Sequence, residues 1–248
     1  MRNVHFLSIF IIVLLAGCKS TYLARENRLM TYTINSDLPE DTAIVNYYSP
    51  FKKTMEGEMN RQIGISEKFL NKSRSEPEFL IGNFFADALL EIGKKIDPAV
   101  EISFSTKGGI RSELKQGAVT VGSMFELMPF ENTITLLDIS GSDLLVLADF
   151  IANTGGQPIG GFTMKIKDNQ VITIRLNGKA IDPAKSYKLV TYDYLANGGD
   201  NVKGLSTPLK RINTSILVRE GLINYVEQLT KENKKINTQL DGRISIIQ

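Results

Sequence analysis

The chain has 248 residues, 42% hydrophobic and 23% charged, which fits one large or two small globular domains and excludes disordered, collagen-like and polytopic membrane classes. Its 29 Lys and Arg residues nearly balance 27 Asp and Glu residues, so the charge gives no indication of nucleic-acid binding. It has one cysteine, Cys18, and one histidine, His5, and a single cysteine excludes an intrachain disulfide.

The N-terminus has the pattern of a secretory signal: a basic start, then an apolar run from Phe6 to Ala16, shorter than the roughly 20 residues that cross a membrane. The run ends in Leu15-Ala16-Gly17-Cys18, which resembles the lipobox of bacterial lipoproteins, in which cleavage precedes the cysteine and the cysteine then carries lipid. We therefore expect a signal peptide over 1–17 and a lipidated tether over 18–43, anchored in the bacterial cell envelope. A lysine follows the cysteine, where an inner-membrane retention signal often has Asp, and this favours the outer membrane. The alternative is an ordinary signal whose cleavage site contains a cysteine.

From the tether onward, the spacing of apolar residues predicts helices and strands without an internal repeat. The elements expected before residue 130 are an optional short strand near 29–34, a helix over 44–58, a strand or turn over 62–67, a helix over 79–95, a strand over 101–105 and a helix over 121–127. The middle of the chain is expected to form a strand over 133–139, a helix over 143–153, a flexible glycine loop over 155–161 and a hairpin of strands over 162–167 and 171–176. The last elements are a strand over 187–191, a glycine turn over 197–200, a helix over 215–232 and a strand over 243–247. Helices and strands do not alternate regularly, which favours an α+β fold. We therefore expect a single domain over 44–248 with a mixed sheet and flanking helices.

The composition also limits the chemistry of the mature chain. Removal of His5 with the signal would leave no histidine, which excludes Ser-His-Asp catalysis, His-containing zinc sites and His-dependent binuclear phosphoesterase centres. The lack of a second cysteine excludes thiolate zinc sites. No P-loop motif is present, and the glycine-rich stretch 155–161 lacks the spacing and the strand-to-helix context of a dinucleotide fingerprint. A carboxylate pair of the glycosidase kind stays open, but no pair stands out. We therefore expect no catalytic residue, no metal site and no cofactor in this chain.

Four segments have the residue types of a ligand site: 81–88, 107–111, 128–132 and 193–200. Two glycine pairs would allow close backbone approach and positive φ, and each precedes a charged residue. Arginine suits phosphate or hydroxyls, a carboxylate suits vicinal hydroxyls, and an aromatic side chain beside a turn can stack on a base. Taken singly, each feature also fits an ordinary turn, a core aromatic or a solvated charge.

In this order the segments resemble the C-terminal, substrate-binding domain of the 5'-nucleotidases, a family that includes UDP-sugar hydrolases and 2',3'-cyclic phosphodiesterases. The resemblance covers about 44–247 and rests on Gly-Gly-Ile-Arg, Met-Pro-Phe-x-Asn and Tyr-Leu-Ala-x-Gly-Gly-Asp, with support from Gly-Asn-Phe in the first segment and Gly-Gly-Phe at 160–162. It implies a nucleotide or nucleoside whose base lies between Phe130 and Tyr194, whose ribose hydroxyls bind Asp200 and whose phosphate side faces Arg111. The full set of substrate-binding residues it implies is Thr106, Gly108, Gly109, Arg111, Phe130, Tyr194, Asn197, Gly198, Gly199 and Asp200.

Three features depart from the family pattern. Thr106 stands where the family usually has Asn, and Ser75, next to Arg74, stands where a further Arg is expected. Family members also carry an N-terminal metallophosphoesterase domain with two divalent metal ions, whereas only the signal and tether precede residue 44. We therefore expect a separate metallophosphoesterase chain as partner in nucleotide catabolism, with this chain inactive alone. The alternatives are a non-catalytic nucleoside- or nucleotide-binding lipoprotein and a structural remnant with a decayed site.

Overall fold

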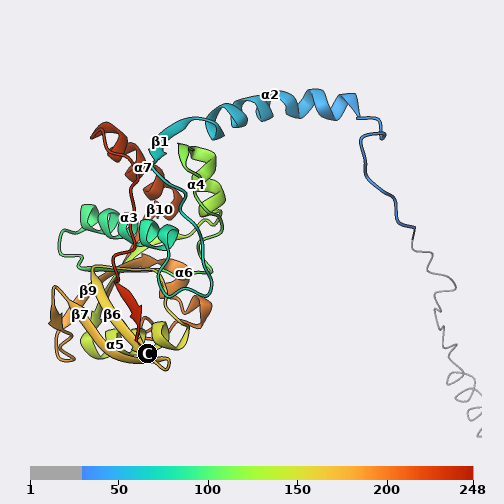
Figure 1. The fold of residues 1–248 in the computed structure, drawn as a ribbon. Helices are drawn as coiled ribbons and strands as arrows, with labels where there is room; N and C mark the ends of the chain where they lie inside the picture. Colours follow the sequence, from blue (N-terminus) through green and yellow to red (C-terminus); the bar gives the residue numbers. More distant parts are fainter. Residues whose placement is uncertain (1–29, 248) are drawn as a thin grey trace, which may run out of the picture. The chain divides into compact units, whose positions relative to one another are not determined.

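The computed structural model describes residues 30–247, in two parts that divide between Tyr47 and Tyr48 and are described separately (Figure 1). The expected signal peptide, Cys18 and the start of the tether lie outside the described residues. Residues 30–41 contain no helix or strand, so the strand option near 29–34 is wrong for residues 30–34. Within residues 30–247, no helix is both long enough and apolar enough to cross a membrane.

Helix α2 (Thr42–Met59) confirms the helix expected over 44–58. The carboxylate of Asp41 accepts a hydrogen bond from the amide of Ala43 at 2.9 Å, which satisfies one of the unpaired donors at the start of the helix. No residue of α2 is buried, so its apolar stripe is not part of the core.

The five-stranded sheet is the centre of the part that starts at Tyr48. Its strands lie in the order β10 (Lys210–Leu217), β4 (Thr133–Ser140), β9 (Ser186–Tyr192), β2 (Ile102–Phe104) and β5 (Ile159–Gly160). Strands β2 and β9 are parallel and the other neighbours are antiparallel, which confirms the expected mixed sheet. Helix α3 (Leu80–Ile96) packs against β2, β5 and β9, and α5 (Gly141–Asn153) packs against β4 and β9 from the opposite face (Figure 1).

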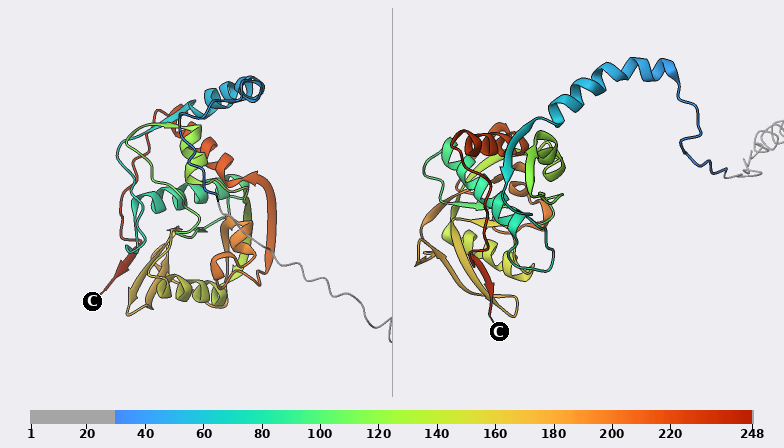
Figure 2. Two further views of the ribbon diagram at one scale, coloured as in Figure 1. Left: turned by 90° about the vertical axis from the view of Figure 1, so that its right-hand side faces the viewer. Right: turned by 45° about the horizontal axis from the view of Figure 1, so that its top comes forward.

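Two smaller sheets complete the fold. One has the order β11 (Ile244–Ile246), β6 (Phe162–Lys167), β7 (Gln170–Leu176) and β8 (Lys179–Ala180), and the other pairs β1 (Gln62–Ser66) with β3 (Gly117–Thr120). Helix α7 (Val218–Lys231) lies beside α3 and α4 (Val121–Leu127), as Figure 2 shows. The short helix α6 (Asp193–Ala196) and a 3₁₀ turn (Gly199–Asn201) follow β9.

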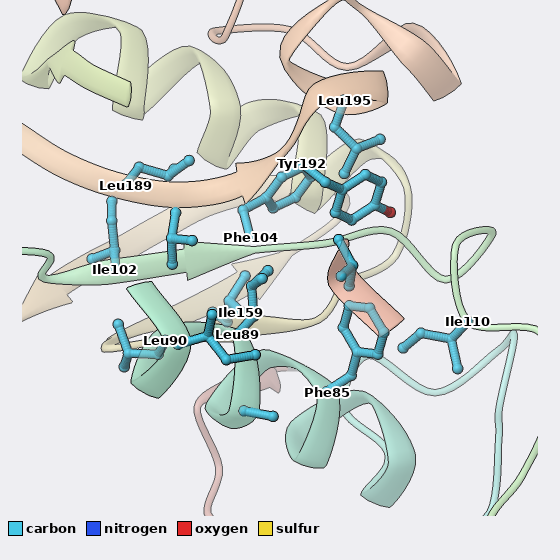
Figure 3. Close-up of a cluster of buried hydrophobic side chains, with 14 of the residues drawn as sticks. Phe85, Leu89, Leu90, Ile102, Phe104, Ile110, Ile159, Leu189, Tyr192 and Leu195 are labelled. Atoms are coloured by element: carbon cyan, nitrogen blue, oxygen red, sulfur yellow. The ribbon is translucent and has the colours of Figure 1, made fainter. Parts of the chain in front are cut away.

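Part of the core lies between α3 and the central sheet. Phe85 and Leu89 of α3 are fully buried together with Ile102 and Phe104 of β2 (Figure 3). Complete burial of one such side chain contributes about 1.5–3 kcal/mol. Gly93 lets α3 approach the sheet closely, because a Cβ at this position would lie only 2.7 Å from Val190. The expected α+β class is therefore confirmed, with helices on both faces of a mixed sheet.

The glycine loop expected to be flexible over 155–161 is instead packed. Residues 156–160 are buried, and Ile159–Gly160 forms β5 beside β2. Gly156 has a φ of 92° and lies so close to Pro77 that a Cβ would overlap its backbone. Glycine at this position therefore allows close packing, and the prediction of flexibility from composition is wrong.

The helix expected over 215–232 begins later than its pattern indicated. Residues up to Leu217 belong to β10, and α7 starts at Val218. Strand β10 pairs with β4 from Lys210 to Asn213 and again at Leu217, and this pairing decides the conformation of the segment. Strands β3, β5, β8 and β10 were not expected, because three of them are too short to show a period and the fourth was assigned partly to a helix.

Candidate ligand-binding site

The topology brings three of the expected segments to one edge of the central sheet. Because β2 is parallel to β9, the residues that follow both strands leave the sheet at the same edge. Strand β4 is antiparallel to β9, so the segment 128–132, which precedes β4, lies there as well. The carboxylate of Asp193 accepts hydrogen bonds from the amides of Thr133 at 3.1 Å and Tyr194 at 2.8 Å, which ties the two sides together.

A cavity of about 280 Å³ lies at this edge, with Gly108, Gly109, Arg111, Phe130, Asn132, Tyr192, Tyr194 and Asp200 around it. Phe130 and Tyr194 remain 38% and 48% exposed, although large aromatic side chains gain most from burial. A larger hollow of about 570 Å³ beside β3 and α4 contains none of the expected site residues. We favour the smaller cavity because it combines two exposed aromatic side chains with a guanidinium and a carboxylate.

Three glycines allow the close contacts of this site. A Cβ on Gly109 would overlap the hydroxyl of Tyr192, one on Gly199 would overlap the ring of Tyr194, and one on Gly108 would lie 3.0 Å from Asp200 Oδ2. The expectation of close approach is therefore correct for these three. Positive φ is found at Gly198 alone of the two pairs, at 86°, so that part of the expectation is wrong for the other three glycines.

Both carboxylate oxygens of Asp200 accept hydrogen bonds from hydroxyl groups of the chain. Thr106 donates to Oδ2 at 2.5 Å and Tyr194 donates to Oδ1 at 3.0 Å. The buried Thr106 hydroxyl in turn accepts from the amide of Gly109 at 3.3 Å. Asp200 has a φ of 53°, a left-handed conformation that costs a residue with a side chain about 1–2 kcal/mol. An ionised carboxylate accepts about four hydrogen bonds, so Asp200 retains capacity for a ligand.

Positive charge gathers on the Arg111 side of the cavity. The guanidinium of Arg111 lies 5.7 Å from the centre of the Phe130 ring, within the range of a cation–π interaction. The ammonium of Lys72 donates to the carbonyl of Ile110, and burial together with the charges of Arg74 and Arg111 lowers the pKa of Lys72. Repulsion among these cations would be relieved by a bound anion, which suits a phosphate group.

The expected residues divide into those at the cavity and those behind it. Six line it, namely Gly108, Gly109, Arg111, Phe130, Tyr194 and Asp200. Thr106 donates a hydrogen bond to Asp200, and Gly199 leaves room for the ring of Tyr194. Gly198 does not line the cavity, and Asn197 accepts from Arg211 Nη1 at 2.8 Å through its Oδ1 atom. Neither Ser75 nor Arg74 lines the cavity.

Sequence reasoning missed two lining residues, Asn132 and Tyr192. Asn132 ends the Met-Pro-Phe-x-Asn motif, so its position in the motif was an available signal. Tyr192 is fully buried, and burial raises the pKa of its phenol. It lies in the same apolar cluster as Phe104 and Leu195 (Figure 3). Nothing in the sequence distinguishes it from an ordinary core residue.

Comparison with known proteins gives a consistent match. A family model described as "5'-nucleotidase, C-terminal domain" matches residues 57–207. An apyrase of Tabanus yao is 26% identical over 94% of this chain and 47% of its own length, and Protein UshA of Escherichia coli is 22% identical over 85% and 38%. The crystal structure of a 5'-nucleotidase precursor from Thermus thermophilus has the same fold, with a TM-score of 0.70 at 23% identity over 84% of this chain and 44% of that one. The chain thus spans less than half the length of these three proteins.

Proposed function

The chain belongs to the family of 5'-nucleotidase C-terminal domains, and from this premise we propose that it binds a nucleotide or nucleoside for a 5'-nucleotidase-type hydrolase in nucleotide catabolism. The observation that carries the proposal is the arrangement of Phe130, Tyr194, Asp200 and Arg111 around one cavity. Two aromatic faces suit a base, a carboxylate suits the ribose hydroxyls and a guanidinium suits a phosphate.

We propose further that a metallophosphoesterase on a separate chain performs the hydrolysis and holds two divalent metal ions. Among residues 30–247, no group of three or more His, Cys, Asp and Glu side chains is placed to hold a metal. The one histidine of the sequence, His5, lies outside that range. The side chains of residues 30–247 therefore do not fit a binuclear phosphoesterase centre, and we assign no metal-dependent step to this chain.

The test has two measurements on the purified chain. Calorimetric titration with adenosine and AMP should show binding by the chain alone. Phosphate release from AMP should appear only after addition of a metallophosphoesterase of the same organism that lacks this domain. Binding without release in the mixture would favour the alternative, a non-catalytic nucleoside-binding lipoprotein. Absence of binding at millimolar ligand, together with absence of release, would overturn the proposal.

We also propose that lipid on Cys18 holds the protein at the bacterial cell envelope, in the outer membrane. The support is the sequence Leu15-Ala16-Gly17-Cys18 after an apolar run. Each buried CH₂ of an acyl chain contributes about 0.8 kcal/mol to membrane binding. Cys18→Ala is therefore expected to move the protein from the membrane to the soluble fraction, measured by fractionation at high salt. A variant that still sediments with membranes would contradict the lipid anchor.

A further inference from the structure

The loop that carries Phe130 is attached to the first turn of α7, at Arg219. The guanidinium of Arg219 donates through Nη1 to the carbonyls of Met128 at 3.3 Å and Phe130 at 3.2 Å. Through Nη2 it donates to the carboxylate of Glu131 at 2.7 Å. The three partners thus belong to the short segment 128–131, which includes Phe130 itself. We propose that Arg219 is a positioning residue that sets Phe130 for stacking on the base.

Because Arg219 is buried, its charge depends on these hydrogen bonds for stabilisation. Its side chain is only 7% exposed, and its guanidinium lies 4.1 Å from the centre of the Phe125 ring. A buried cation is costly unless it is fully paired, and the planar guanidinium satisfies several acceptors only in one orientation. The loop must therefore adopt the conformation that presents its carbonyls to Arg219.

Few other backbone bonds hold this loop. Among residues 30–247, the backbone of 129–131 forms one hydrogen bond, and Arg219 donates it to Phe130. Pro129 has no amide hydrogen to donate. On the far side of the loop, the amide of Val218 donates to the carbonyl of Asn132 at 2.9 Å. Two neighbouring residues of α7 thus fix both ends of the segment that presents the Phe130 ring.

That Phe130 stacks on a base rests on the proposed function, but the placement of Phe130 is measurable without ligand. The variants are Arg219→Met, which keeps the length of the side chain but not its charge, and Arg219→Lys, which keeps the charge but not the planar fork. Arg243→Met is the matched control. Arg243 is also a mostly buried arginine, 11% exposed and paired with Asp87 and Asp241, and it does not line the cavity.

Two readouts are compared across these variants of the full chain: the NMR chemical shifts of the Phe130 ring and of the Phe130 and Glu131 amides, and calorimetric affinity for adenosine. Arg219→Met should shift the ring and amide signals and weaken adenosine binding about tenfold. Arg219→Lys should restore part of each. Arg243→Met should lower the thermal midpoint and leave both readouts unchanged.

Unchanged ring and amide signals in Arg219→Met would overturn the inference. If Arg219→Met does not fold, Glu131→Gln and Arg219→Lys decide, since Glu131 is 75% exposed and its replacement should be tolerated. Unchanged Phe130 signals in both would then overturn it. If the wild-type chain binds no adenosine, the proposed function fails, whereas the ligand-free signals still decide whether Arg219 places Phe130.

Discussion

Replacement of either exposed aromatic residue of the cavity by alanine, Phe130→Ala or Tyr194→Ala, is expected to weaken adenosine binding by about 5- to 150-fold. Stacking of a base on an aromatic side chain contributes about 1–3 kcal/mol, and about 1.4 kcal/mol corresponds to a tenfold change in affinity. The two rings line the same 280 Å³ cavity, Phe130 from the loop before β4 and Tyr194 from α6, which follows β9. Loss of either ring would leave one face of the base in water.

Isothermal titration calorimetry with adenosine measures this effect. Phe69→Ala is the matched control. Phe69 is 47% exposed, compared with 38% for Phe130 and 48% for Tyr194, but it lines the larger hollow beside β3 and α4. It should bind adenosine like the wild type. Equal affinity of wild type, Phe130→Ala and Tyr194→Ala would mean that the base does not lie between these rings.

Much of the fold could be predicted from local patterns in the sequence. Helices α3 and α4 lie within one or two residues of their predicted bounds, because apolar residues recur at helical spacing and Thr120 caps α4 with Ser123. Strand β5 could not be predicted, since two residues carry no period and their conformation is decided by pairing with β2. Long-range pairing also decided the start of α7 against a helical pattern that extended into β10.

The candidate site was predictable where motifs mark it and not where contacts cross the fold. Phe130, Tyr194 and Asp200 stand in short sequence motifs, and the topology places all three at one edge of the sheet. Arg219 lies in an amphipathic helix with no motif of its own, so its bonds to the Phe130 loop appear only in three dimensions. The same holds for the pairing of Thr106 with Asp200.

The carboxylate of Asp200 gives the second large effect, in the choice between sugars. Asp200→Asn is expected to weaken adenosine binding by about 10- to 150-fold and to leave 2',3'-dideoxyadenosine nearly unchanged. A hydrogen bond to a charged group contributes about 1.5–3 kcal/mol, and the dideoxy sugar has no hydroxyl to donate it. Calorimetric titration of both ligands against both proteins measures the difference. An equal loss for the two ligands would place the sugar hydroxyls away from Asp200.

Two further variants separate the placement of Asp200 from its charge. Thr106→Val and Tyr194→Phe each remove one hydroxyl that donates to this carboxylate and keep most of the side-chain shape. Because these hydroxyls hold Asp200 in its left-handed conformation, each variant should weaken adenosine about 2- to 10-fold, in line with one hydrogen bond of about 0.5–1.5 kcal/mol. Binding of 2',3'-dideoxyadenosine should stay constant, since the stacking face of Tyr194 is kept. Tighter adenosine binding in either variant would instead show that the hydroxyls compete with the ribose for the carboxylate oxygens.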